Sequence, residues 1–385
     1  MTLKRSRIKH AISPLSFKHR DSCVQQLRGA LQERFRDGTR WDDIVHMDRC
    51  LPPTHPLDAT SLVFKGTLMR RRVYGKLVWR SVNQKGGANT ERNLMENELE
   101  AAVCGGVTPC VPLRYASVEI NYDIFKQTEM FRALRGFMKH GKRRRSDHTL
   151  HVMLMEDCGA TSLAEYWNTE GSFEDAHAIV FMLFHALSWL SNMGISHNDL
   201  HGSNVILRTI EPTCVAFGDC RFVTSTLPYI IDWDLGRSDR AKNANLSGYN
   251  HVGIFDNHNA LFDTVGLTKT LCWLHKHRTK APSAPLDKLI GVLHEVNEPL
   301  ARIHPWIFKE NLSIPQRNGT VELATVQQTP YVPDQGTGVA VSRWPETVAR
   351  DAPSLNEITA AIYESMHSAK KKFNHTVHKF PPTAV

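Results

Sequence analysis

The stretch from Phe173 to Gly194 is apolar on most of its circumference and constrains the fold more than any other part of the chain. A segment that is hydrophobic nearly all round has to be covered by other parts of a globular protein. Gly194 is of the residue type that most often ends helices. The sequence therefore predicts a long, largely buried helix. The residues with helical spacing are Ile179, Leu183, Ala186, Leu187 and Leu190.

A polar loop, HNDLHGSN, follows this helix after the apolar step Ile195, and the apolar residues VIL come next. A loop held between a packed helix and a strand is a rigid place for functional side chains. The carboxylate of Asp199 could accept a proton from a hydroxyl there. The amide oxygen of Asn204, five residues later, is a hard donor of the kind that Mg²⁺ prefers. The commonest alternative is that both residues only form a turn.

The stretch YIIDWDLG places Asp232 directly after two apolar residues. A carboxylate at the end of a buried strand is costly unless it is paired or bound to a metal. A base, an amide ligand and a carboxylate ligand, in this order, are the parts needed for phosphoryl transfer from Mg·ATP.

These residues resemble the eukaryotic-type protein kinase superfamily. Its catalytic-loop pattern H-x-D-x-x-x-x-N is met by His197, Asp199 and Asn204, and the later IIDWD resembles its metal motif. The resemblance runs from about 57 to 300. It implies an α+β, bilobal fold, in which a small β-rich N-lobe with one main helix precedes a larger, mostly helical C-lobe. It also implies ATP and Mg²⁺ as cofactors.

Further parts of a kinase site follow from the resemblance. Met155 takes the gatekeeper position, and Glu156 and Cys158 would present backbone groups to the adenine edge. Glu98 is the expected ion-pairing residue of the small-lobe helix. Asp263, in FDTVGLTKTL, resembles the buried Asp of the helix that anchors the large lobe.

The chain also departs from the family. DATSLVFKG has one Gly where the phosphate loop usually has three, and VWR puts Arg80 where the phosphate-pairing Lys is expected. Lys76 or Lys65 could replace it, and the sequence leaves the choice open. Asn198 stands where an Arg normally contacts a phosphorylated activation segment, which predicts activity that is not gated in this way. His201 stands in the place of a Lys and could contact the γ-phosphate.

The metal motif reads Asp232-Trp233-Asp234, with Trp233 in an apolar Phe position. A register shifted by two, with Asp234 as the metal ligand, is the alternative, although the two Ile residues before Asp232 fit the preceding strand better. His197 is expected to pack beneath the loop rather than to carry a proton.

Changes in composition and in hydrophobic pattern along the chain predict three regions. The first is a basic extension with one amphipathic helix (1–56), and the second is a kinase-like domain (57–307) with an insertion at about 120–147. The third is a C-terminal extension with one late helix (308–385). SLVFKG, YGKLVWRSV, VPLRYASVEI and LHVMLMED read as strands. Beyond Gly194 the prediction is mainly helical until about 307, apart from the short VIL strand and the strand YIIDWD.

Lys and Arg outnumber Asp and Glu by 47 to 39, and much of the excess lies in three clusters. Such clusters can attract nucleic acid, an acidic partner or a nuclear import receptor, but solvated tails are the commoner explanation. Nucleic acid is therefore an unlikely partner. The clusters are Lys4–Arg20, Lys139–Arg145 and Lys370–Lys372.

The eight Cys residues form no C-x-x-C pair, and no apolar stretch approaches the roughly 20 residues of a membrane span. We expect an intracellular protein, cytoplasmic or nuclear, that has no membrane segment.

The function that these observations favour is an ATP-dependent protein kinase acting on Ser or Thr, divergent in the manner of the kinases of large DNA viruses. One alternative is a small-molecule kinase of the aminoglycoside or choline type, which the DLHGSN loop favours. The other is a catalytically impaired pseudokinase scaffold, which the missing glycines and Arg80 favour.

Overall fold

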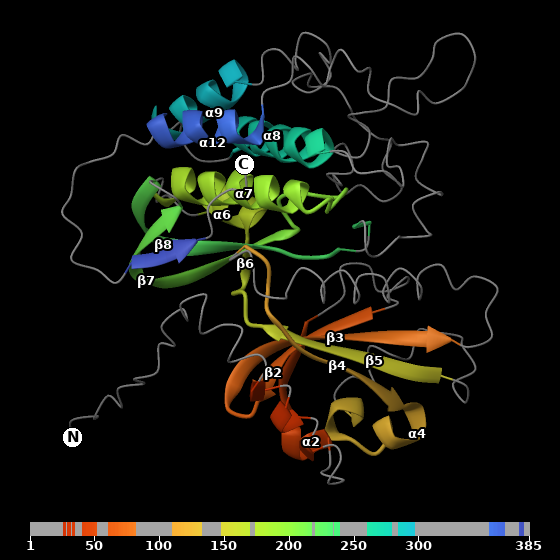
Figure 1. Cartoon of the computed structure of the whole chain (residues 1–385). Coiled ribbons are helices and arrows are strands. Elements are labelled where there is room, and N and C mark those ends of the chain that lie inside the picture. Colours follow the sequence, from red (N-terminus) through yellow and green to blue (C-terminus); the bar gives the residue numbers. More distant parts are fainter. Residues whose placement is uncertain are drawn as a thin grey trace, which may run out of the picture.

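The computed structural model describes twelve parts of the chain, and every structural statement below concerns these parts. They are residues 26–34 without 28 and 32, 41–51, 61–81, 110–132, 148–169, 174–217, 220–233, 235–238, 260–278, 284–296, 354–365 and 377–380. They form a mixed α+β structure with two β-sheets, as the sequence predicted at this coarse level. Figure 1 shows the two sheets one above the other, with a group of helices beyond the second sheet.

The first sheet has five strands in the order β1-β2-β3-β5-β4, and all neighbours pair antiparallel. Within β3, Val73 and Leu77 belong to the core on one face, whereas Tyr74 and Lys76 alternate with them on the other. The strands are β1 (Val45–Leu51), β2 (Ser61–Leu68), β3 (Arg71–Ser81), β4 (Arg114–Asn121) and β5 (His148–Glu156).

Strands β2 to β5 confirm the four strands predicted for the front of the chain. Strand β1 was not predicted; it lies in the region expected to be an extension and pairs with β2 along its length. Its sequence, VHMDRCL, contains charged residues of the kind more common in loops than in strands. As an edge strand it tolerates them, because charged residues are common at sheet edges.

Short helical segments cover the core face of the first sheet. Helices α2 (Trp41–Ile44) and α4 (Tyr122–Phe125) contribute Ile44 and Phe125 to the core. The predicted N-terminal amphipathic helix contributes Leu27 and Leu31, both buried. The start of the predicted insertion is therefore structured as α4, and residues 133–147 lie outside the described parts.

The second sheet is built on a long hairpin of β7 (Val205–Phe217) and β8 (Cys220–Ile230). For residues 205–230 the prediction of a mainly helical chain, with only the short VIL strand and the strand YIIDWD, was wrong, because both strands belong to this longer hairpin. Pro212 and Pro228 read as strand breakers, but Pro212 lies within the irregular register between Thr209 and Thr213, and bulges accommodate proline. The sheet is completed by β6 (Thr161–Ser162) and by β9 (Val377–Phe380), which pairs with β7 in parallel.

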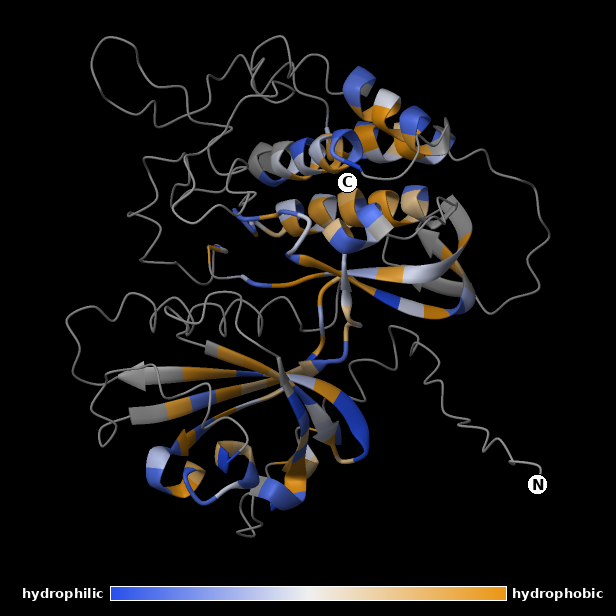
Figure 2. Cartoon of the chain, turned by 180° about the vertical axis from the view of Figure 1, so that it is seen from behind, coloured by the Kyte–Doolittle hydropathy of each residue, from blue (hydrophilic) through white to orange (hydrophobic). Residues whose placement is uncertain are grey.

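Helix α7 (Glu174–Asn192) is the buried helix that the sequence predicted, and its residues from Ala176 to Leu190 are all buried. It lies between the second sheet and a further layer of helices (Figure 1), and Figure 2 shows many hydrophobic residues along its middle. The other helices of this region are α6 (Leu163–Thr169), α8 (Ala260–Lys276), α9 (Ala284–Val296) and α12 (Leu355–Ser365).

Helix α12 belongs to the predicted C-terminal extension and packs on α7. Ile358 and Ile362, one helical turn apart, are fully buried in the same core as α7. Ser354 and Glu357 form a reciprocal cap at its start, because each backbone N–H donates to the other side chain. The late helix is therefore part of the core of the second sheet and its helices.

Several predictions lie outside the described parts. These are the helix that carries Glu98, Asp234 as the alternative metal ligand, and the boundaries at 56/57 and 307/308. None of the helices in the parts that are described has the length and hydropathy needed to cross a membrane.

Candidate active site

The polar loop leaves α7 through the glycine stop that the sequence predicted. Gly194 has a φ of 67°, and the N–H of Ile195 turns back to the carbonyl of Leu190 at 2.9 Å. Ser196 then forms a two-way backbone bridge with Arg237. The loop is thereby fixed to the segment that follows Asp232.

Asp263 of α8 holds the loop from below. Its Oδ2 accepts the backbone N–H of His197 at 2.7 Å, and its Oδ1 accepts that of Asn198 at 2.8 Å. Burial raises the pKa of this carboxyl to about 6, although the two backbone hydrogen bonds lower it. The prediction that Asp263 is buried is confirmed.

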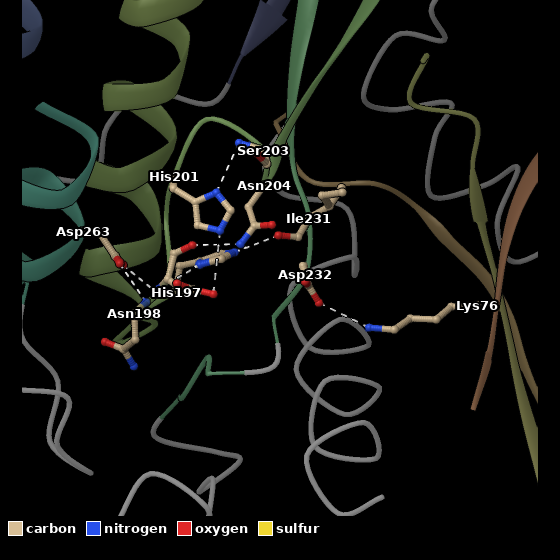
Figure 3. A network of polar contacts seen from close by, with 10 residues as sticks. Lys76, His197, Asn198, His201, Ser203, Asn204, Ile231, Asp232 and Asp263 are labelled. Carbon is tan, nitrogen blue, oxygen red and sulfur yellow. Dashed lines mark hydrogen bonds and ion pairs between the residues drawn. The ribbon is translucent and has the colours of Figure 1, made fainter. Parts of the chain in front are cut away.

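His197 packs beneath the loop, as predicted, and its side chain is fully buried. Its Nδ1 accepts the N–H of Asp199 at 3.2 Å, so the ring proton lies on Nε2, which donates to the carbonyl of Ile231 at 2.8 Å. The ring also packs against Trp233, with 4.6 Å between centroids. His197 therefore joins the backbone at Asp199 to the backbone just before Asp232 (Figure 3).

Asn198 adopts a left-handed conformation, with a φ of 64°. Asn tolerates this region better than most residues. Its Nδ2 donates to the carbonyl of Leu235 at 2.9 Å, and the side chain is buried. Asn198 thus holds the segment after Asp232 through a neutral amide.

Asp199, His201 and Asn204 lie together on the loop. His201 Nδ1 accepts the N–H of Ser203 at 3.2 Å, and its Nε2 lies 4.0 Å from Asp199 Oδ2. Asn204 Nδ2 donates to the backbone carbonyl of Asp199 at 2.9 Å. About a fifth of each of the Asp199 and His201 side chains is exposed to solvent.

Gly202 allows the loop to approach the helices closely. A Cβ there would lie 3.2 Å from Ala164 Cβ and 3.2 Å from a methyl group of Leu274. The carbonyl of Gly202 accepts the N–H of Ala164 at 3.1 Å. The loop is therefore seated on α6 and α8, which makes it a rigid support for Asp199 and Asn204.

Asp232 follows β8 and faces the first sheet. Lys76 Nζ of β3 lies 3.3 Å from Asp232 Oδ1, and Figure 3 shows the two side chains pointing toward each other. The Lys76 side chain is 10% exposed, but that of Asp232 is 46% exposed. Asp232 also has a positive φ of 65°, which is uncommon for a residue other than glycine. Trp233, the next residue, is fully buried.

The sequence left three basic residues open for the phosphate-contacting position: Arg80, Lys76 and Lys65. The contact with Asp232 favours Lys76. Lys65 Nζ instead donates to the carbonyl of Gly159 at 3.2 Å. Arg80 lies on the same strand as Lys76, opposite Thr149 of β5, and the position of its side chain is not among the described ones.

The expected adenine-binding residues end β5 and begin the connector to β6. Met155 pairs with Tyr74 of β3, and the N–H of Glu156 donates to the carbonyl of Leu113 at 2.8 Å. The carbonyl of Glu156 accepts Cys158 Sγ at 3.2 Å. The N–H of Glu156 is therefore engaged within the chain.

Two residues of this region were not found from the sequence. Arg208 of β7 and Tyr229 of β8 both contact the Glu156 carboxylate. Each is a single polar position in a strand, and no local pattern distinguishes it from a surface residue.

The oxygen donors near Asp232 fit a magnesium ion that brings its own phosphate ligands. Asn204 and Asp232 offer an amide and a partly exposed carboxylate, both hard donors. Within the described parts of the chain, no group of three or more His, Cys, Asp or Glu side chains converges as a metal site. Mg²⁺ usually needs only one or two protein carboxylates when substrate phosphates supply other ligands.

Comparison of the chain with protein-family models found no matching family, and comparison with curated proteins found no match.

Proposed function

We propose that this chain is an ATP-dependent protein kinase that phosphorylates Ser or Thr hydroxyls. The observation that carries the proposal is the meeting of Lys76 with Asp232 beside the loop of Asp199 and Asn204. A Lys on the third strand, a loop with Asp and Asn, and an Asp after a later strand are the parts that kinase chemistry uses.

Asp199 is the residue that we assign to the substrate hydroxyl. Its backbone is held through His197 and the Asn204 amide, so its carboxylate is positioned without being buried. It would orient the hydroxyl and accept its proton. His201 Nε2, 4.0 Å from this carboxylate, would donate to the transferred phosphate group.

Asn204 and Asp232 would hold Mg²⁺, and Lys76 would contact the phosphates of ATP. The magnesium ion supplies charge neutralisation and alignment of the phosphates when bound. Lys76 suits this role because its ammonium is mostly buried and lies beside the Asp232 carboxylate that would hold Mg²⁺. The backbone of residues 156–158 would contact the adenine.

The order of the elements supports a bilobal, kinase-like fold. The first sheet would form the small lobe, and the second sheet with α6 to α9 the large one. The bond from Asn198 to Leu235 supports activity without activation-segment phosphorylation, because a neutral amide takes the place of a phosphate-binding Arg. The cysteine content supports an intracellular location, cytoplasmic or nuclear.

One of the two arguments for a pseudokinase concerned Arg80, and the position of Lys76 weakens it. The small-molecule kinase remains an outcome of the test below.

The test uses purified full-length protein with Mg·ATP labelled at the γ-phosphate, in parallel with Asp199→Ala. Three acceptor pools are offered: mixed Ser/Thr proteins, aminoglycosides, and choline-like amines. Label on protein that disappears with Asp199→Ala supports the proposal. Transfer only to small molecules would replace it with the small-molecule kinase, and nucleotide binding without any transfer would replace it with the pseudokinase.

A further inference from the structure

The connector between the two sheets, residues 157–160, is held by side chains of the first sheet. Arg72 Nε of β3 lies 3.4 Å from Asp157 Oδ2. The carbonyl of Gly159 accepts Lys65 Nζ at 3.2 Å and also the Tyr74 hydroxyl. Three side chains from β2 and β3 thus fix one side of the connector.

The second sheet holds the start of the connector through Glu156, the last residue of β5. Glu156 Oε1 accepts Arg208 Nη1 at 3.1 Å and the Tyr229 hydroxyl at 3.2 Å, and its Oε2 accepts the N–H of Leu113 at 3.3 Å. The two charged side chains are only 13% (Glu156) and 18% (Arg208) exposed. We call Glu156, Arg208 and Tyr229 the connector clamp.

The opposite charges of Arg208 and Glu156 in the connector clamp support one another. Burial alone would lower the pKa of Arg208, but Tyr229 and Glu156 reverse this effect and raise it. Ion pairs that are shielded from water and hydrogen-bonded at several atoms are geometrically demanding. The Glu156 carboxylate is thus fixed with respect to both β7 and β8.

The backbone of the connector also packs closely against the second sheet, at Gly159. Gly159 has a φ of 106°, and a Cβ there would lie 2.2 Å from the carbonyl oxygen of Leu207, the neighbour of Arg208. Only glycine fits this approach. The connector therefore lies directly against β7 at the position where Arg208 reaches Glu156.

We propose that Arg208 and Tyr229 are positioning residues for nucleotide binding, because they fix through Glu156 the backbone of residues 156–158 that would contact the adenine. This inference rests on the proposed function. It assigns nucleotide affinity to two residues on strands of the second sheet, neither of which is expected to touch the nucleotide.

The test measures the dissociation constant of Mg·ADP and the steady-state constants for ATP in Tyr229→Phe and Arg208→Lys, with full-length protein. Each change removes or misplaces hydrogen bonds of the connector clamp and keeps the bulk of the side chain. We expect the dissociation constant and the KM for ATP to rise about threefold to tenfold. The kcat should stay within about twofold, since the loop of Asp199 is untouched.

Tyr363→Phe is the matched control, because it removes a hydroxyl from α12 in the same core, on the far side of α7. Unfolding by denaturant is measured for each variant. Unchanged affinity in both clamp variants, an equal loss in the control, or a loss that only follows the folded fraction would overturn the clamp alone. Absence of nucleotide binding by the wild type would overturn the proposed function together with it.

Discussion

Lys76 Nζ and Asp232 Oδ1 lie 3.3 Å apart although 156 residues separate them in the chain. Lys76 comes from the first sheet and Asp232 follows the last long strand of the second. The pair is unequal, because the lysine is mostly buried and the aspartate is half exposed. An exposed carboxylate with a buried cation behind it can bind a further ligand without losing its ion pair.

Replacing Lys76 should therefore impair phosphoryl transfer far more than replacing Arg80. We expect Lys76→Met to lower kcat/KM for ATP by about 100-fold, the usual cost of one lost charge-stabilising donor. Arg80→Met, four residues along the same strand, is the matched control and should change it by less than about threefold. The measurement is initial-rate kinetics over ATP concentration. If Arg80→Met is the more damaging change, the assignment of Lys76 is wrong.

Asp263 should make a pH-dependent contribution to stability that can be isolated. Its pKa is raised from 3.8 to about 6, so the folded state binds the proton more tightly than the unfolded state. The contribution is then greatest at low pH and is lost as the pH rises from about 4 to about 6. The free energy of unfolding of wild type minus that of Asp263→Asn should fall across this window by roughly 3 kcal/mol. Denaturant titrations at several pH values measure it, and a difference that rises with pH would contradict this sign.

His185 of α7 should act in the opposite direction. Burial lowers its pKa to about 4, so the neutral ring is favoured in the folded state. The contribution of the neutral His185 ring to stability is fully present above pH 6.5 and is lost as the pH falls toward 4. His185→Leu should remove this acid sensitivity, which amounts to roughly 3 kcal/mol. Thermal unfolding of both proteins between pH 4 and 7 provides the comparison; parallel curves would show that His185 does not titrate in this way.

The left-handed backbone at Asn198 predicts an inverted order of two small substitutions. Both Asn198→Gly and Asn198→Ala lose the bond to Leu235, but only alanine is strained at a φ of 64°. We expect the glycine variant to be more stable than the alanine variant by about 1 kcal/mol. At an ordinary helical position the order is reversed. The free energy of unfolding of the two variants decides the matter, and an alanine variant of equal or greater stability would show that no strain is present.

The sequence predicted those parts of the site that lie next to a recognisable run of apolar residues or within a segment that resembles a family element. The apolar run before His197 identified α7 and the loop, and two isoleucines before Asp232 identified the end of a strand. The burial of Asp263 was predicted from the resemblance of its helix to a family element and is confirmed, whereas its contacts with the loop were not predicted. The role of His197 as a support was also predicted.

The remaining parts depend on pairing between distant segments, which local patterns do not reveal. Lys76 and Arg80 have the same parity on β3, so only the position of Asp232 favours one of them. The β7–β8 hairpin was not predicted, because Pro212 and Pro228 are of a residue type that usually interrupts strands. Arg208 and Tyr229 matter only because Glu156 lies against them.

The most direct measurement of the central claim is a single turnover of γ-labelled Mg·ATP with enzyme in excess and a Ser/Thr peptide present. Wild type should transfer the label to the peptide. Asp199→Ala, with an unchanged dissociation constant for the nucleotide, should transfer it about 1000-fold more slowly, because it binds the nucleotide but lacks the base. Equal rates in the two proteins, or no nucleotide binding by the wild type, would contradict the account.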